Sequence, residues 1–168
     1  MKLDLGCGNK KKEGFTGVDI IPLPDVDIVM DLEKFPWRFK DNSVEEVYCS
    51  HYVEHATDLV RFMEEVWRIC KNGAKATFVA PHYGSTLAIQ DPTHKRLICP
   101  ETFLYFNKKW REDYTIGYYP IKANFEILNI AVVYNPEWAG KPQEELMKAQ
   151  RRYLNVIDHI IAELKTLK

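Results

Sequence analysis

The sequence predicts a single α/β domain over residues 1–168, with a mainly parallel sheet and helices on its faces. Three observations lead to this prediction. Apolar segments of strand length alternate with segments of helical periodicity, the order typical of parallel sheets. A glycine-rich turn directly follows the first strand-like segment, as in folds that hold a nucleotide at a strand end. The length of 168 residues fits one domain with one core.

Composition and charge narrow the class of protein. Apolar residues make up 46% and charged residues 28% of the chain, as in globular domains. The formal net charge is -1 without a long run of Lys or Arg, so no nucleic-acid interface is evident. The four cysteines form no C-x-x-C pair, which fits a reducing compartment. No signal peptide and no apolar stretch of about 20 residues is visible, so we expect a cytoplasmic protein without membrane contact.

The N-terminal part reads as short strands joined by loops. Met1–Leu5 has the pattern of a strand, and Gly6–Asn9 forms the turn that follows it. Lys10–Gly14 predicts a brief helix that a glycine ends. Thr16–Ile21 is the expected second strand. Two prolines exclude a regular helix directly afterwards, so a short loop leads to the third strand at Val26–Met30.

The middle of the chain carries the clearest helix. Val44–Cys49 predicts the fourth strand. In Asp58–Lys71 the apolar residues recur at three- and four-residue spacing, which makes one buried stripe. Asp58 or the preceding threonine can cap this helix, and Asn72-Gly73 is a suitable stop. Ala74–Ala80 then predicts the next strand.

The C-terminal part is less regular. His82–Trp110 is a long aromatic-rich stretch in which a proline opens a short helix, Pro100–Phe106. Phe125–Tyr134 predicts a strand, with which Tyr114–Tyr119 can pair. Gln143–Leu164 predicts a final amphipathic helix with an apolar stripe, which either folds onto the sheet or pairs with a second subunit. We therefore expect a homodimer.

Acidic residues follow the strand ends where a ligand is expected. In a parallel sheet, ligands bind beyond the carboxyl ends of the strands, where the strand order reverses. The turn Asp4–Asn9 lies at such an end, and its glycines let the backbone approach a ligand. Asp19 ends the second strand and can accept both ribose hydroxyls of a nucleoside, while Asp31 follows the third. A dinucleotide is the competing ligand, but Lys11 replaces the third glycine that a pyrophosphate site requires.

These motifs resemble, in order, those of class I S-adenosylmethionine (SAM) dependent methyltransferases. Leu3–Gly8 is similar to the first motif of the family and Gly17–Ile20 to the second. Further matches, up to about residue 106, are Asp31–Pro36, Ser50–His55, Glu65–Gly73 and Asp91–Arg96. The last of them resembles a signature of a small, type-11-like branch of predicted methyltransferases. The resemblance implies a Rossmann-like fold with an antiparallel C-terminal strand, SAM as cofactor and S-adenosyl-L-homocysteine as product.

The resemblance also implies which residues contact SAM. Glycines of the turn would line its methionine part, Asp19 would hold the ribose, and Asp31 would meet the adenine. The full implied set is Asp4, Gly6, Cys7, Gly8, Asp19, Ile20, Asp31, Leu32, Ser50 and His51. The chain departs from the family where Asn9 replaces a glycine, and where helices before the first strand and between the second and third strands are missing. These departures predict an open pocket, or one closed by residues 82–110 or a second subunit.

The segment His51–His55 has a competing interpretation. It matches the H-x-x-E-H pattern of one class of zinc proteases, in which both histidines of a helix would hold zinc and Glu54 would activate water. That arrangement needs a third ligand from a downstream helix, which the sequence does not identify. The methyltransferase resemblance explains the same residues without a metal, so the sequence predicts no metal site.

The expected reaction is methyl transfer to an oxygen or nitrogen of a small molecule, with a sugar or glycan precursor as one candidate. SAM brings its own leaving group, so the enzyme mainly aligns the acceptor with the methyl group. A histidine near its usual pKa can take the acceptor's proton; His82 and then His94 are the favoured bases, with loop hydrogen bonding as their structural alternative. Two other functions stay open: a methyltransferase-like binding or regulatory subunit, and a nicotinamide-dependent oxidoreductase, which Lys11 disfavours.

Overall fold

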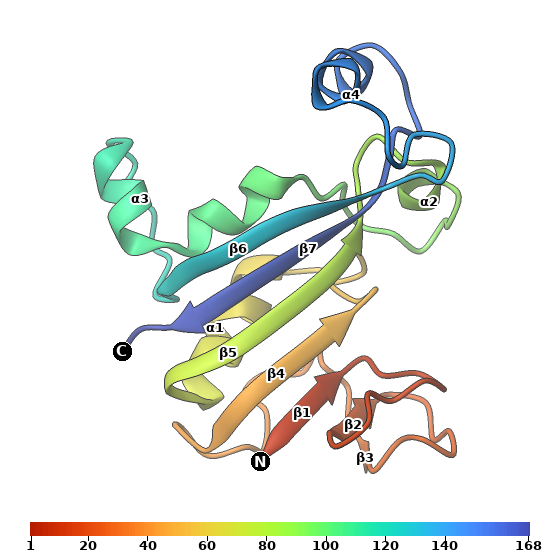
Figure 1. Ribbon diagram of the computed structural model, residues 1–168. Coiled ribbons are helices and arrows are strands. Elements are labelled where there is room, and N and C mark those ends of the chain that lie inside the picture. Colours follow the sequence, from red (N-terminus) through yellow and green to blue (C-terminus); the bar gives the residue numbers. More distant parts are fainter.

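The computed structural model describes residues 1–168, which form one seven-stranded sheet with helical segments (Figure 1). The strand order is β3-β2-β1-β4-β5-β7-β6. The strands are β1 Lys2–Leu5, β2 Thr16–Asp19, β3 Ile28–Val29, β4 Val44–Ser50, β5 Cys70–Pro81, β6 Phe125–Tyr134 and β7 Ile157–Thr166. β7 alone runs in the direction opposite to the other six strands. The predicted mainly parallel sheet with an antiparallel C-terminal strand is therefore confirmed.

One face of the sheet is covered by α1 and by a 3-10 helix, η1. The helical segments are α1 Leu59–Ile69, α2 Thr86–Ile89, η1 Pro100–Phe106, α3 Lys108–Asp113 and α4 Gln143–Gln150. Asp58 caps α1 by accepting a hydrogen bond from the backbone N–H of Arg61 at 2.9 Å. On the same buried face, Phe103 of η1 stacks on Phe78 of β5 with ring centroids 5.7 Å apart. None of the helices is long and apolar enough to cross a membrane.

The opposite face of the sheet carries no helix (Figure 1). Along β4 and β5, buried apolar residues alternate with less buried, mostly polar ones, as in a sheet with one solvated face. Charged side chains on that face pair across neighbouring strands: Lys2 with Glu46, Lys75 with Glu163, and Lys165 with Glu126. Loops connect β1 to β2 and β2 to β3, so the expected loss of the helix between β2 and β3 is confirmed.

The brief helix predicted at Lys10–Gly14 is wrong, because this connection is a loop. The backbone N–H of Lys12 donates to Asp4 Oδ2 at 2.7 Å. Lys11 Nζ forms an ion pair with Asp27 at 2.8 Å. These two contacts hold the loop against Asp4 of β1 and against Asp27, which precedes β3.

The C-terminal prediction is wrong in two places. Tyr114–Tyr119 forms turns rather than a strand, with Thr115 in the left-handed region at φ 59°. The predicted helix Gln143–Leu164 divides into α4 and β7, because Asn155 takes the left-handed conformation at φ 58° between them. From Ile160 to Thr166 every second residue is buried, which is the period of a strand. This segment fills the sheet between β5 and β6 instead of covering its face.

The carboxyl ends of β1 and β4 mark the point where the strand order reverses. These two strands lie side by side in the centre of the sheet. From β1 the chain proceeds outward through β2 to β3, and from β4 it proceeds to β5 on the other side. Ligands of open α/β sheets bind at this reversal, so it is where a site is expected.

Candidate functional site

A cavity of about 490 Å³ lies at this reversal point. Its lining comes from residues at or just beyond the carboxyl ends of β1 to β4 and from one distant loop. Six of the residues predicted to contact SAM line it: Gly6, Asp19, Ile20, Asp31, Leu32 and His51. The other lining residues are Ile21, Met30, Glu33, Tyr52, His55 and Thr93. The volume is within the range of pockets that hold small molecules and cofactors.

The glycine turn shapes the floor of the cavity. Gly6 has φ +70° and Gly8 has φ +55°, which side chains with a Cβ rarely adopt. A Cβ at Gly6 would lie 2.9 Å from the Tyr52 side chain, whereas a Cβ at Gly8 would meet nothing within 4 Å. The turn therefore needs glycine for its backbone at both positions, and at Gly6 also for space beside the cavity.

Asp19 lies at the end of β2 with its carboxylate fixed by the backbone. Its Oδ2 accepts a hydrogen bond from Gly8 N at 2.9 Å, and its Oδ1 accepts one from Ile21 N at 3.0 Å. Each carboxylate oxygen can accept more than one hydrogen bond, so acceptor capacity remains toward the cavity. A carboxylate held in this way suits a ligand with two neighbouring hydroxyls, such as ribose.

Four predicted cofactor residues do not line the cavity: Asp4, Cys7, Gly8 and Ser50. Asp4 is buried beneath the turn, and burial raises the pKa of its carboxyl group. Cys7 is buried too; burial, followed by the negative charges of Asp4 and Asp19, raises the pKa of its thiol to about 11. Gly8 acts through its hydrogen bond to Asp19, and Ser50 ends β4 just before His51. Asp4 and Gly8 therefore act through the structure of the turn, by their hydrogen bonds with Lys12 N and Asp19.

Glu33 and Tyr52 also line the cavity, and the sequence did not predict either of them. The Glu33 carboxylate accepts hydrogen bonds from the Tyr52 hydroxyl and from Thr57 N, both at 3.1 Å. Burial and then the Glu33 charge raise the pKa of Tyr52 well above its ordinary value. The only sign in the sequence that these residues line the cavity was their position. Glu33 comes two residues after Asp31, and Tyr52 comes directly after His51.

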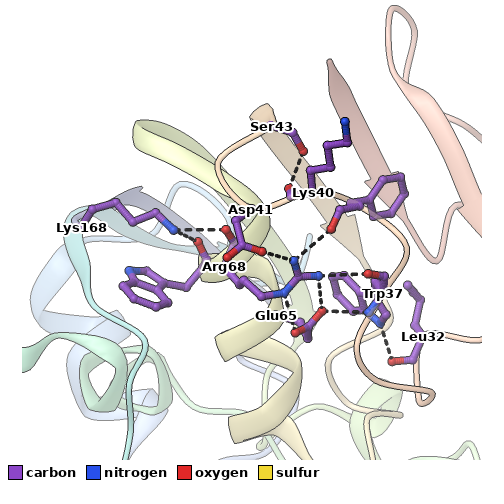
Figure 2. A network of polar contacts seen from close by, with 10 residues as sticks. Leu32, Trp37, Lys40, Asp41, Ser43, Glu65, Arg68 and Lys168 are labelled. Atoms are coloured by element: carbon purple, nitrogen blue, oxygen red, sulfur yellow. Dashed lines mark hydrogen bonds and ion pairs between the residues drawn. The ribbon is translucent and has the colours of Figure 1, made fainter.

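Arg68 ties α1 to the loop that follows β3 and carries Leu32 (Figure 2). Its guanidinium donates to both carboxylate oxygens of Glu65 at 2.8 Å and to the carbonyl groups of Trp37 at 3.0 Å and Phe39 at 2.9 Å. The backbone N–H of Trp37 also donates to Glu65 at 2.9 Å, and its indole N–H donates to Leu32 O at 3.1 Å. The network therefore positions Leu32 at the cavity from outside it.

The two predicted bases lie in different places. His82 is buried outside the cavity, where its Nδ1 accepts a hydrogen bond from Gly84 N at 3.1 Å, and burial lowers its pKa. His94 does not line the cavity either, but its ring lies 4.7 Å from the ring of His55, which does. Residues 51–57 form turns rather than a helix, so the geometry of the zinc-protease interpretation is absent.

Comparisons with known proteins agree with this geometry. Residues 3–78 match the family model described as "Methyltransferase domain". A SAM-dependent methyltransferase from Archaeoglobus fulgidus is similar, with a TM-score of 0.70 and 22% identity over 98% of this chain and 85% of that chain. A candidate methyltransferase from Bacillus halodurans gives a TM-score of 0.63 and 16% identity over 99% and 92% of the two chains.

A third similar structure is the complex between the Trm112 methyltransferase activator of Haloferax volcanii and a candidate methyltransferase. Its TM-score is 0.60, with 14% identity over 99% of this chain and 82% of that chain. A search of curated proteins found no match.

Fold and site together define the class of protein. The strand order, the glycine turn and the acidic residues at the strand ends are those of a Rossmann-like class I methyltransferase. Residues 3–78 match the methyltransferase-domain model, and the whole chain has the fold of SAM-dependent methyltransferases. Both findings support methyl transfer with SAM as cofactor. The polar groups at the cavity suit this cofactor, because Asp19 keeps acceptor capacity for ribose hydroxyls and Gly6 leaves backbone exposed to the ligand.

Proposed function

We propose that the protein transfers the methyl group of SAM to an oxygen or nitrogen atom of a small molecule, with sugars and glycan precursors as the first class to test. The single observation that carries this proposal is the cavity at the strand reversal, which combines apolar walls with convergent polar groups. Asp19 binds the ribose, Asp31 and Leu32 receive the adenine, and Gly6 lies along the methionine part. His51 lies where the sulfonium is expected.

Calorimetric titration with SAM and S-adenosyl-L-homocysteine tests the cofactor roles. We expect micromolar binding that Asp19→Ala abolishes. Because Asp19 also accepts backbone hydrogen bonds, Asp19→Asn serves as a second variant that keeps one carbonyl oxygen in place. Glu13→Ala is the matched control, since Glu13 is exposed and has no polar partner. Full SAM binding by Asp19→Ala would overturn the ribose assignment.

Turnover separates an enzyme from a binding or regulatory subunit of the same fold. The protein is incubated with labelled SAM and panels of hydroxylated and amine-containing small molecules. Methylated product supports the proposal. SAM binding without product in any panel would favour the regulatory alternative, and NAD binding would favour the oxidoreductase.

The homodimer expected from the sequence stays a prediction. The feature of the fold that supports it is the outer edge of β6, where Leu128 is 48% exposed and Val133 is 41% exposed. An edge strand offers unpaired backbone groups to a second chain. Light scattering at micromolar concentration should give the mass of a dimer, and a monomeric mass would refute the prediction.

A further inference from the structure

Three potential metal ligands from two distant segments meet beside the cofactor cavity. Glu54 and His55 follow β4, and His94 lies in the loop between α2 and η1. One ligand atom from each of these residues lies within 4.8 Å of the other two. The rings of His55 and His94 meet edge to face, with their planes at 77°. Both segments belong to the site, since His55 and Thr93 line the cavity.

Hydrogen bonds hold the two segments together, so the cluster is built into the fold. The backbone N–H groups of Lys95 and Arg96 donate to Glu54 O at 2.8 and 3.3 Å. The guanidinium of Arg96 donates to Ala56 O at 2.5 and 3.1 Å and to Thr57 O at 2.8 Å. A ligand set fixed from both sides in this way loses little conformational freedom when it binds an ion.

Both histidines make their hydrogen bonds through Nδ1, which leaves Nε2 available to a metal; the Asp91 carboxylate lies 3.9 Å from His94 Nε2, beyond hydrogen-bond distance. His94 Nδ1 lies 2.8 Å from Ala88 O, and a carbonyl oxygen can only accept, so Nδ1 carries the proton. Thr93 Oγ1 donates to Asp91 Oδ1 at 2.7 Å, so it accepts from His55 Nδ1 at 3.1 Å. A neutral imidazole protonated on Nδ1 has its lone pair on Nε2. Metal-bound histidines typically donate their other N–H to such a carbonyl or polar partner.

The carboxylate of Glu54 is buried without a hydrogen-bond partner. Its side chain is 1% exposed, and neither carboxylate oxygen accepts a hydrogen bond. His51 Nδ1 lies 3.3 Å from Oε1, but it pairs electrostatically only when the imidazole is protonated. A buried charge without compensation is costly. A cation bound between Glu54 and the two histidines would remove that cost.

We propose that Glu54, His55 and His94 bind a divalent transition-metal ion of the zinc type. Two imidazoles and one carboxylate suit Zn²⁺ and its neighbours better than Mg²⁺ or Ca²⁺. Zinc–ligand bonds of about 2.0–2.1 Å place tetrahedral ligand atoms about 3.4 Å apart. Side-chain rotations that move each ligand atom by about 1 Å would bring the three atoms to this spacing. Three protein ligands leave a fourth position open, as in catalytic rather than structural zinc sites.

The role of the ion rests on the proposed function and narrows it to an oxygen acceptor. An acceptor hydroxyl that binds the open position loses its proton to solvent more easily, because the metal stabilises the alkoxide. The alkoxide oxygen then forms a bond to the methyl carbon of SAM as the carbon–sulfur bond breaks. The electron pair of that bond stays on sulfur, giving S-adenosyl-L-homocysteine. This role replaces the general-base role predicted for His94.

Metal binding is tested first with Zn²⁺ alone. Chelator-treated protein competes for Zn²⁺ with a chromophoric chelator, and Co²⁺ reports the coordination geometry by its visible absorption. We expect one equivalent of Zn²⁺ and the absorption of tetrahedral Co²⁺. His94→Ala should weaken Zn²⁺ binding at least 100-fold, and Glu54→Gln at least tenfold. His82→Ala is the matched control, because His82 lies outside the cavity and makes its hydrogen bond with Gly84 N.

Melting temperatures distinguish a loss of Zn²⁺ binding from a loss of folding. In metal-free protein, Glu54→Gln removes a buried uncompensated charge and should melt no lower than the wild type, yet Zn²⁺ should not raise its melting temperature. Absence of stoichiometric Zn²⁺ binding, or equal binding by His94→Ala and Glu54→Gln, would overturn the metal site. A SAM titration of the zinc-free protein separates the two proposals. SAM binding without Zn²⁺ binding rejects only the metal site, whereas Zn²⁺ binding without SAM binding rejects the methyltransferase role and keeps the site.

Discussion

Replacing Arg68 tests whether the network behind the cavity stabilises both the fold and the cofactor site. Arg68→Ala removes the guanidinium that contacts Glu65, Trp37 and Phe39, and it leaves the Glu65 carboxylate with one remaining donor, Trp37 N. Breaking a buried ion pair in this way costs about 3–5 kcal/mol. Because the Arg68 side chain is 24% exposed, we expect the lower end, about 3 kcal/mol.

Thermal unfolding and SAM titration measure the two effects of this change. For a chain of this size, about 3 kcal/mol corresponds to a melting temperature lowered by about 6–12 °C. If about 1.4 kcal/mol of the lost free energy is needed to hold the loop with Leu32 in its SAM-binding position, the SAM dissociation constant rises about tenfold. Arg38→Ala is the control: Arg38 is exposed in the same loop without a polar partner, and its change should stay within about 0.5 kcal/mol.

A double variant identifies the source of the loss. If the uncompensated charge of Glu65 destabilises Arg68→Ala, then adding Glu65→Gln should recover part of the lost stability. The reasoning is refuted if Arg68→Ala costs less than about 1 kcal/mol, because that is the value of an exposed ion pair. It is also refuted if the second substitution makes the protein still less stable.

Three further predictions concern the turn, acid stability and the predicted base. Gly6→Ala should weaken SAM binding at least tenfold, because its Cβ meets Tyr52, whereas Gly8→Ala should cost only about 1–2 kcal/mol of backbone strain; equal SAM affinities of the two variants would contradict this. Burial raises the pKa of Glu65, but its hydrogen bonds from Arg68 and Trp37 outweigh burial and lower it below 4.5. Its contribution to stability is therefore present above pH 4.5 and lost as the pH falls through the lowered value, so urea unfolding of Glu65→Gln should depend less on pH between about 6 and 3.5. His82→Gln should bind SAM normally, since His82 lies outside the cavity.

The sequence predicted the elements whose signals are local. β1 was predicted from a short apolar run, β2 from a strand-like segment with an acidic end, and α1 from an amphipathic stripe with a capping residue. Each of these signals lies within the element itself. Gly6 and Asp19 were predictable for the same reason, because position at a strand end alone brings them to the cavity.

The elements missed depend on contacts between distant segments. β7 is a strand because it pairs with β5 on one side and β6 on the other. Without knowledge of these two partners, its apolar residues fit the stripe of a helix as well as the pattern of a strand. Asn155 was the one local sign of a break. Both His55 and His94 follow strand ends that the sequence places at one edge of the sheet, but their direct contact was not predictable, because α1, β5 and α2 separate them in the sequence.

The strands themselves account for the stability of the sheet face that no helix covers. Parallel sheets normally have helices on both faces and strands that are apolar throughout. Here β5 alternates instead, with Ala74, Ala76 and Phe78 buried and Lys75 and Thr77 on the solvated side. The paired charges across the strands satisfy that side without a helix. Every residue of the cavity comes from a strand end or a loop, so the cavity is lined without any contribution from a helix between β2 and β3.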